Sequence, residues 1–130
     1  FDLTFEEYEI EKEWCSGPVS LMAYQANHKA GEGPACALRI TIEGKTLTYS
    51  GDGAWSDGLA KAAAGADLFI AEVNFYDKDV SFHMNLQTLT AHLDEIAPKR
   101  LILTHMDEDM LERAKNLDFE TAHDGKIVEI

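Results

Sequence analysis

The sequence has 130 residues and a formal net charge of −13, from 11 Lys and Arg against 24 Asp and Glu, and 45% of its residues are hydrophobic. This length and apolar content predict one globular domain and exclude a disordered acidic tail. The longest uncharged apolar stretch, around residues 68–71, is far shorter than the roughly 20 residues of a membrane-spanning helix. No signal peptide is visible, so we expect a cytoplasmic protein without a membrane partner.

The residues up to position 50 have the pattern of strands. Residues 19–25, 35–42 and 46–50 alternate or run apolar with β-branched content, and Glu43-Gly44-Lys45 is a hairpin signal between the last two. This part therefore predicts an antiparallel meander.

The rest of the chain alternates helices with strands. Helices are predicted at 56–66, with Ser56 as N-cap, at 85–97, ended by Pro98, and at 107–116, with acidic residues in the first turn. Strands are predicted at 67–72, 100–104 and 126–130. Residues 1–130 thus form a single α/β (α+β) domain with one mixed sheet and flanking helices.

Charge and cysteine content limit the partners and the compartment. Tight non-specific nucleic-acid binding rests on clustered Lys and Arg, whereas these residues are scattered singly here. The charge therefore disfavours nucleic acid, although an acidic fold can carry a local basic site. Cys15 and Cys36 form neither a CxxC nor a zinc pattern, so free thiols are favoured over a disulfide.

Candidate metal ligands follow three of the predicted strands. They are His28 in Asn27-His28, Asp52 in Ser50-Gly51-Asp52-Gly53, and His105 in Thr104-His105; His83 precedes the second helix. An Asp carboxylate can bridge two cations, and each neutral imidazole can bind one. A surface histidine or an ordinary turn is the commoner explanation of each motif alone. The metal hypothesis therefore depends on their order along the chain.

That ordered series resembles the C-terminal half of the metallo-β-lactamase superfamily, especially its ribonuclease Z-like branch of metal-dependent hydrolases. Tyr49-Ser50-Gly51-Asp52 looks like the family's metal-bridging Asp segment, and Thr104-His105 looks like its final metal-ligand His. His28 looks like the intermediate ligand, and His83 resembles the additional His near the scissile group.

The resemblance implies a dinuclear site and a reaction. His28, Asp52 and His105 would hold divalent metal, zinc or alternatively manganese or iron, with two ions per complete site. Asp52 would also be catalytic as the bridge, and His83 would protonate the leaving group. The implied function is hydrolysis of a phosphodiester or other ester, with a small molecule or short phosphodiester as substrate. Asp57 and Glu72 could support the ligands, although a solvated or helix-capping role is favoured for both; His92 and His123 are interpreted as structural or solvated.

Two features of the sequence indicate that it covers only part of the family fold. The His-x-His-x-Asp-His cluster of the family's N-terminal half is absent, and the chain begins at Phe1 without an initiator Met. We therefore expect this chain to be about the C-terminal half of an αββα sandwich. Its partner would be the N-terminal half of the same protein or a second copy, covering an inner face that carries Leu38, Ile40, Leu68, Ile70, Leu101 and Leu103.

Two alternative functions come from other classes. A non-catalytic α/β binding or assembly module, or an inactive fragment, would keep the scaffold without the metal chemistry. A nucleotide-binding domain is disfavoured because neither GxGxxG nor GxxxxGK[ST] occurs.

Overall fold

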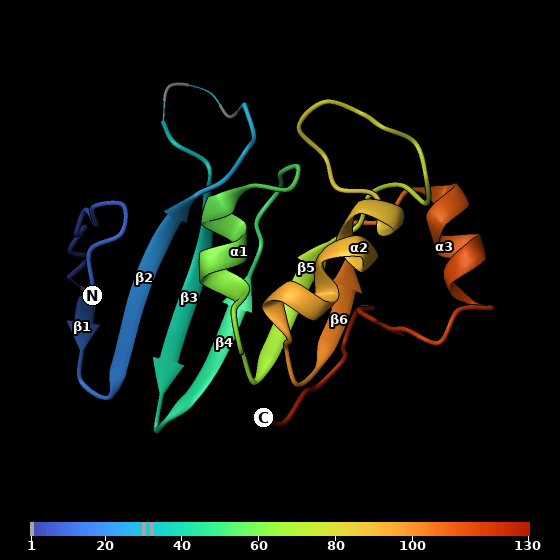
Figure 1. Cartoon of the computed structure of the whole chain (residues 1–130). Coiled ribbons are helices and arrows are strands. Elements are labelled where there is room, and N and C mark those ends of the chain that lie inside the picture. Colours follow the sequence, from blue (N-terminus) through green and yellow to red (C-terminus); the bar gives the residue numbers. More distant parts are fainter. Residues whose placement is uncertain (1, 30, 32) are drawn as a thin grey trace.

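The computed structural model describes residues 2–29, 31 and 33–130; Phe1, Ala30 and Glu32 lie outside the described residues. It contains one seven-stranded mixed sheet in the order β1-β2-β3-β4-β5-β6-β7, with three helices against it (Figure 1). In chain order the elements are β1 (Trp14–Ser16), β2 (Val19–Gln25), β3 (Cys36–Ile42), β4 (Lys45–Tyr49), α1 (Asp57–Ala63), β5 (Leu68–Glu72), α2 (Leu86–Ile96), β6 (Leu101–Thr104), α3 (Glu108–Ala114) and β7 (Glu120–Thr121). The predicted α/β class with one mixed sheet is confirmed.

The meander and the later parallel strands meet at β4. Strands β1 to β4 pair antiparallel, and β4 to β7 pair parallel. The predicted β3–β4 hairpin turns on two residues, Glu43 and Gly44, with φ of 49° and 77°. Two successive positive φ values match a type I′ turn, whose twist suits a hairpin. The parallel strands need crossovers, which α1, α2 and α3 supply.

Each helix begins at a side-chain cap. The side chains of Ser56, Asn85 and Asp107 each accept a hydrogen bond from the backbone N–H three residues later in the chain. The three donor–acceptor distances are 3.2, 2.7 and 2.7 Å. Such a cap stabilises a helix by about 1 kcal/mol. These caps place the start of each helix close to its predicted position.

One face of the sheet carries the core. The helices pack there on alternate strand residues, and full burial of a large apolar side chain such as Phe69 or Leu89 stabilises the fold by about 1.5–3 kcal/mol. The buried cluster includes Ala37, Leu59, Ala62, Phe69, Ala71, Leu86, Leu89, Ile96, Leu103 and Met110.

The opposite face of the sheet is apolar and has no helix on it among the described residues. Cross-strand pairing places Leu38, Ile40, Leu47 and Ile70 on this face. Ile42 and Tyr49 share it and remain 43% and 40% exposed. We call it the open face. A groove of about 360 Å³ on it is lined by Ile40, Ile42, Glu43, Lys45, Leu47 and Ile130.

Two predictions about the strands are wrong. Residues 126–130 form no strand, and the last strand is β7, whose Glu120 and Thr121 pair with β6. The segment is rich in β-branched residues, which favour strands, but among the described residues it pairs with no strand of the sheet, and Ile127 is 90% exposed. Leu101 and Leu103 do not share a face with Leu38 and Ile40, because they pair with Phe69 and Ala71 on the helix-covered side.

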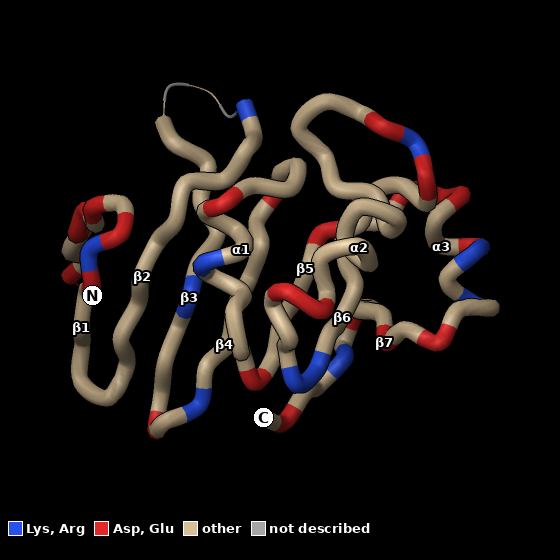
Figure 2. Tube along the Cα trace, in the orientation of Figure 1, with Lys and Arg blue, Asp and Glu red and all other residues tan. Residues whose placement is uncertain are grey.

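Other expectations concern the surface and the thiols. Cys15 and Cys36 are both free thiols. No helix among the described residues is long and apolar enough to cross a membrane. Lys and Arg are distributed singly or in small groups over the described chain (Figure 2).

Candidate metal centre

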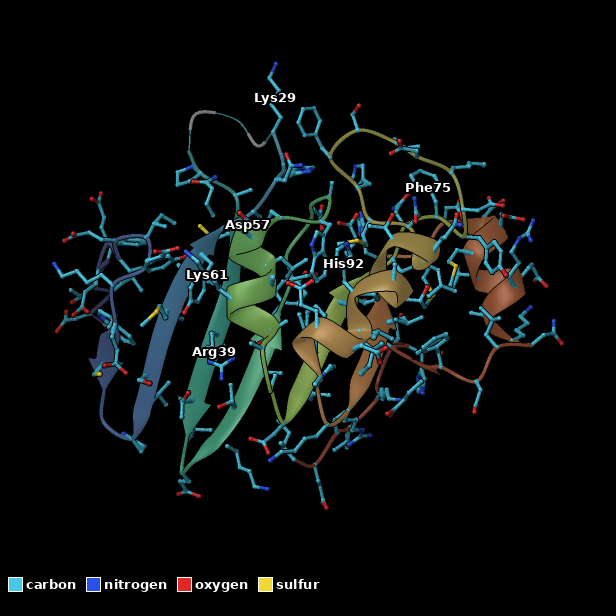
Figure 3. The ribbon with its side chains drawn as sticks, in the orientation of Figure 1. Lys29, Arg39, Asp57, Lys61, Phe75 and His92 are labelled. Carbon is cyan, nitrogen blue, oxygen red and sulfur yellow. The ribbon has the colours of Figure 1, made fainter. Side chains whose placement is uncertain are left out.

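The predicted ligands meet at one edge of the sheet. Strands β2, β4, β5 and β6 run in the same direction, so their carboxyl ends lie along the same edge. An isolated bridge between Asn27 and Ala54, with an Ala54 N–H to Asn27 O bond of 3.1 Å, joins the loop of His28 to the loop of Asp52. In Figure 3, Lys29 and Phe75 mark the two loops that flank this edge.

Asp52 follows a glycine that no other residue can replace without rearrangement. Gly51 has a φ of 62°, and a Cβ built on it would lie 2.6 Å from the backbone oxygen of Cys36. Ser50 Oγ accepts a 2.8 Å bond from Glu72 N–H and donates a 2.7 Å bond to Gly51 O. The turn before Asp52 is therefore fixed against β3 and β5.

Glu72 is the buried centre of the site. It ends β5, and it is 1% exposed. Its Oε2 accepts a 2.5 Å hydrogen bond from Gly53 N–H, and its Oε1 lies 2.5 Å from His83 Nδ1. A carboxylate accepts, so His83 Nδ1 carries the hydrogen and Nε2 is left as the other functional atom. The expectation of a solvated or capping role for Glu72 is wrong.

His105 faces both carboxylates. Its Nε2 lies 3.7 Å from Asp52 Oδ2 and 3.9 Å from Glu72 Oε1, too far for hydrogen bonds. Its backbone is left-handed, with a φ of 55°, and Asn74 Nδ2 donates a 3.1 Å bond to its carbonyl. Asn74 thereby helps to hold the His105 backbone in an uncommon conformation.

His28 completes a row of imidazoles. Its ring centroid is 5.3 Å from that of His83, and the His83 ring is 5.9 Å from that of His105. Its Nδ1 lies 2.9 Å from the backbone oxygen of Phe82. The structure thus brings together all four residues predicted from the sequence, and adds Glu72.

The donor set suits a divalent cation. Donor atoms of Glu72, His83 and His105 all lie within 4.8 Å of one another. Imidazole nitrogens with carboxylate oxygens are typical ligands of zinc and related metals. The site also carries negative charge, from Asp52 and Glu72. Partial burial, and after it the charges of these two carboxylates, raise the pKa of the neighbouring Tyr49 above its ordinary value. A cation is therefore attracted to this edge.

Three other residues singled out in the sequence have different roles. Asp57 is exposed in the first turn of α1 (Figure 3). His92 stacks on Trp55 at 4.0 Å between ring centroids and bonds to Glu95, so it is structural. His123 is exposed, and its Nδ1 lies 3.0 Å from Asp124 O.

The sequence names Glu72 as a possible support of the ligands but favours a solvated or capping role, so its buried, central position is new. The sequence signal for its burial is that this carboxylate ends an apolar strand, Leu-Phe-Ile-Ala-Glu. Asn74, in the same segment, carries no pattern that indicates its bond to His105.

Comparison with known protein sequences identifies one family model and two relatives that match most of the chain. A family model described as "Beta-lactamase superfamily domain" matches residues 2–106. The chain is 25% identical over 123 residues to "Probable metallo-hydrolase YhfI" of Bacillus subtilis, covering 92% of this chain and 49% of that protein. It is 30% identical over 116 residues to "Uncharacterized protein ML1173" of Mycobacterium leprae, covering 80% and 41%.

Solved structures agree on the fold. The crystal structure of the metallo-β-lactamase fold protein YhfI from Bacillus subtilis superposes with a TM-score of 0.69 at 26% identity, over 88% of this chain and 50% of that one. Human tRNase Z, short form, superposes with a TM-score of 0.70 at 21% identity, over 90% and 45%. A diphosphatase from the PhnP family superposes with a TM-score of 0.73 at 18% identity, over 92% of this chain and 47% of that one. The chain therefore spans about half the length of the proteins it matches.

Proposed function

Because the chain belongs to the metallo-β-lactamase superfamily, we propose that its sheet-edge cluster is part of the active site of a metal-dependent hydrolase. The observation that carries this proposal is the convergence of Glu72, His83 and His105 donor atoms within 4.8 Å. Asp52 and His28 lie beside them, and His28, Asp52 and His105 would hold the ion. A divalent ion held there, with zinc as the leading candidate, would supply a water nucleophile of lowered pKa and polarise the bond to be cleaved.

The chain's own residues divide the remaining work. Asp52 and His105 would hold the ion from the carboxyl ends of β4 and β6. Glu72 accepts a hydrogen bond from His83 Nδ1–H, which leaves His83 Nε2 to face the leaving oxygen. In its imidazolium form the ring would donate the Nε2 proton to that oxygen and keep its Nδ1–H hydrogen bond to Glu72. Partial exposure of His83, 27% for its side chain, makes that atom reachable from solvent.

For the substrate, we propose a small molecule or short phosphodiester. A net charge of −13 repels a long polyanion, which favours a short substrate. Proteins of the same fold include one named as a diphosphatase and one named as a tRNase Z, which is compatible with phosphate-ester chemistry.

For the open face, we propose that a further part of the same protein covers it. Its partly exposed apolar residues, with Ile42 43% exposed, would gain from burial. The matched proteins are about twice as long as the matched region, and two copies each charged at −13 would repel one another. The 130-residue chain should therefore bind a hydrophobic dye at its open face; a stable, compact monomer that binds no such dye would contradict this.

Metal titration tests the site directly. Zn²⁺ added to the metal-free chain should bind, and His105→Ala should weaken binding at least tenfold. His123→Ala is the matched control, because His123 is exposed and lies in a separate turn. Equal affinity in wild type and His105→Ala would remove the support for the proposed site.

Hydrolysis is tested separately in the protein expressed from its full open reading frame. His83→Ala should lower kcat on bis(p-nitrophenyl) phosphate by about 10²–10⁴-fold while metal content is unchanged, as expected for loss of a general acid. Metal binding with no hydrolysis of any ester would favour a binding module instead.

A further inference from the structure

We propose that the backbone carbonyl of Phe82 is the positioning group for His28, fixing the hydrogen on Nδ1 and leaving Nε2 as the metal-binding atom. This inference rests on the proposed function and specifies how one ligand is prepared. Its basis is the 2.9 Å contact between His28 Nδ1 and Phe82 O, across 54 positions of the chain.

The hydrogen position on His28 follows from the chemistry of its partner. A carbonyl oxygen only accepts, so a hydrogen bond at 2.9 Å requires His28 Nδ1 to donate. Nε2 of the neutral ring then carries a lone pair. Metal-binding histidines commonly donate their other ring N–H to a carbonyl or carboxylate, which fixes the ring orientation. The Phe82 ring also contacts the His28 ring edge-on, with 6.4 Å between the ring centroids and an interplanar angle of 84°.

Phe82 has a backbone conformation that its side chain does not favour. His83 N–H donates a 3.2 Å bond to Val80 O, so residues 80–83 form a turn. Phe82 is the third residue of that turn and has a φ of 68°, a position where glycine is preferred. A residue with a Cβ is disfavoured there, because the Cβ approaches the following carbonyl oxygen. Such a strained backbone at an exposed residue beside a cluster of imidazoles is typical of functional sites.

The turn is fixed at both of its functional ends. Phe82 contributes the carbonyl that meets His28, and the next residue, His83, is held by the buried Glu72 through its side chain. On the other side, the Asn27–Ala54 bridge fixes the backbone just before His28. The His28 ring is thus oriented from the opposite side of the site, by a turn whose direction the left-handed Phe82 sets.

The hydrogen position can be measured without any metal. Long-range ¹H–¹⁵N NMR of the metal-free chain at about pH 8.5, two units above the pKa of about 6.5 of free imidazole, separates the two neutral forms. We expect His28 with its hydrogen on Nδ1. A wild-type spectrum with the hydrogen of His28 on Nε2 would overturn the proposal, whatever the enzyme's activity.

A pair of proline variants then tests the role of the turn. Phe82→Pro forces a φ near −65° and moves the carbonyl, whereas Ser81→Pro places proline at the second turn position, which favours it. Phe82→Pro should shift the hydrogen of His28 to Nε2 and weaken Zn²⁺ binding about tenfold to hundredfold; Ser81→Pro should change neither.

The outcomes separate this proposal from the proposed function. If Phe82→Pro keeps the Nδ1 hydrogen and the wild-type affinity, Phe82 does not position His28. If the Nδ1 hydrogen is present and is lost in Phe82→Pro, but the full protein hydrolyses no ester, the positioning stands and the hydrolase assignment fails. The wild-type spectrum decides the first point even if Phe82→Pro does not fold.

Discussion

Gly51→Ala should damage both the fold and the candidate site, by an amount that the structure predicts. Gly51 is left-handed, with a φ of 62°, and this costs a residue with a Cβ roughly 1–2 kcal/mol. The new Cβ would also lie 2.6 Å from Cys36 O, a backbone atom of β3 that cannot swing away. Overpacking of this kind adds roughly 1–3 kcal/mol. The free energy of unfolding should therefore fall by about 2–5 kcal/mol in total.

Gly65→Ala is the matched control for Gly51→Ala. Gly65 has nearly the same φ, 61°, but nothing lies within 4 Å of a Cβ built on it. It should lose only the roughly 1–2 kcal/mol of the left-handed conformation. Urea unfolding of both variants isolates the clash as the difference between them. Gly51→Ala should also weaken Zn²⁺ binding, because Asp52 follows it; equal unfolding free energies and affinities in the two variants would refute the reasoning.

Two further predictions concern carboxylates. Glu72→Gln should weaken Zn²⁺ binding at least tenfold, because the amide nitrogen must face either Gly53 N–H or His83 Nδ1–H; a titration matching wild type would contradict this. Hydrogen bonds from Arg100 and then from Lys126 lower the pKa of Glu120 from 4.5 to about 2. Because the pKa of Glu120 is lower in the folded than in the unfolded state, its ionised carboxylate stabilises the fold at pH values above the unfolded pKa. This stabilisation is lost as the carboxylate is protonated, so thermal stability should decrease as the pH falls from about 4.5 to about 2. Thermal melts of Glu120→Gln should show a shallower decrease over that window, and an identical pH profile would argue against the ion pairs.

Local signals account for the parts of the fold that could be predicted. Ser56 starts α1, and Glu43-Gly44 turns the β3–β4 hairpin, because each signal acts within a few residues. The edge strands β1 and β7 have only three and two residues, so their pairing depends on a neighbouring strand and leaves no periodicity to detect. The sequence therefore predicts a strand at 126–130, whereas the structure has its last strand at Glu120–Thr121.

The candidate site was predictable where residue types and strand ends coincide. Asp52 and His105 follow strands that run in the same direction, so the topology brings them together. Glu72 was underrated because an isolated glutamate is usually solvated, and only the structure shows its 1% exposure. Phe82 gave no signal at all, since the sequence has no glycine at its left-handed turn position.

The metal stoichiometry of the 130-residue chain tests the central claim most directly. Elemental analysis after saturation with Zn²⁺ and extensive dialysis should give one ion per chain in wild type and none in His105→Ala. The proposed ligands brought together at this edge are His28, Asp52 and His105. Three protein ligands should hold one ion and not the two of a complete site. Two tightly held ions per chain, or none, would contradict the account.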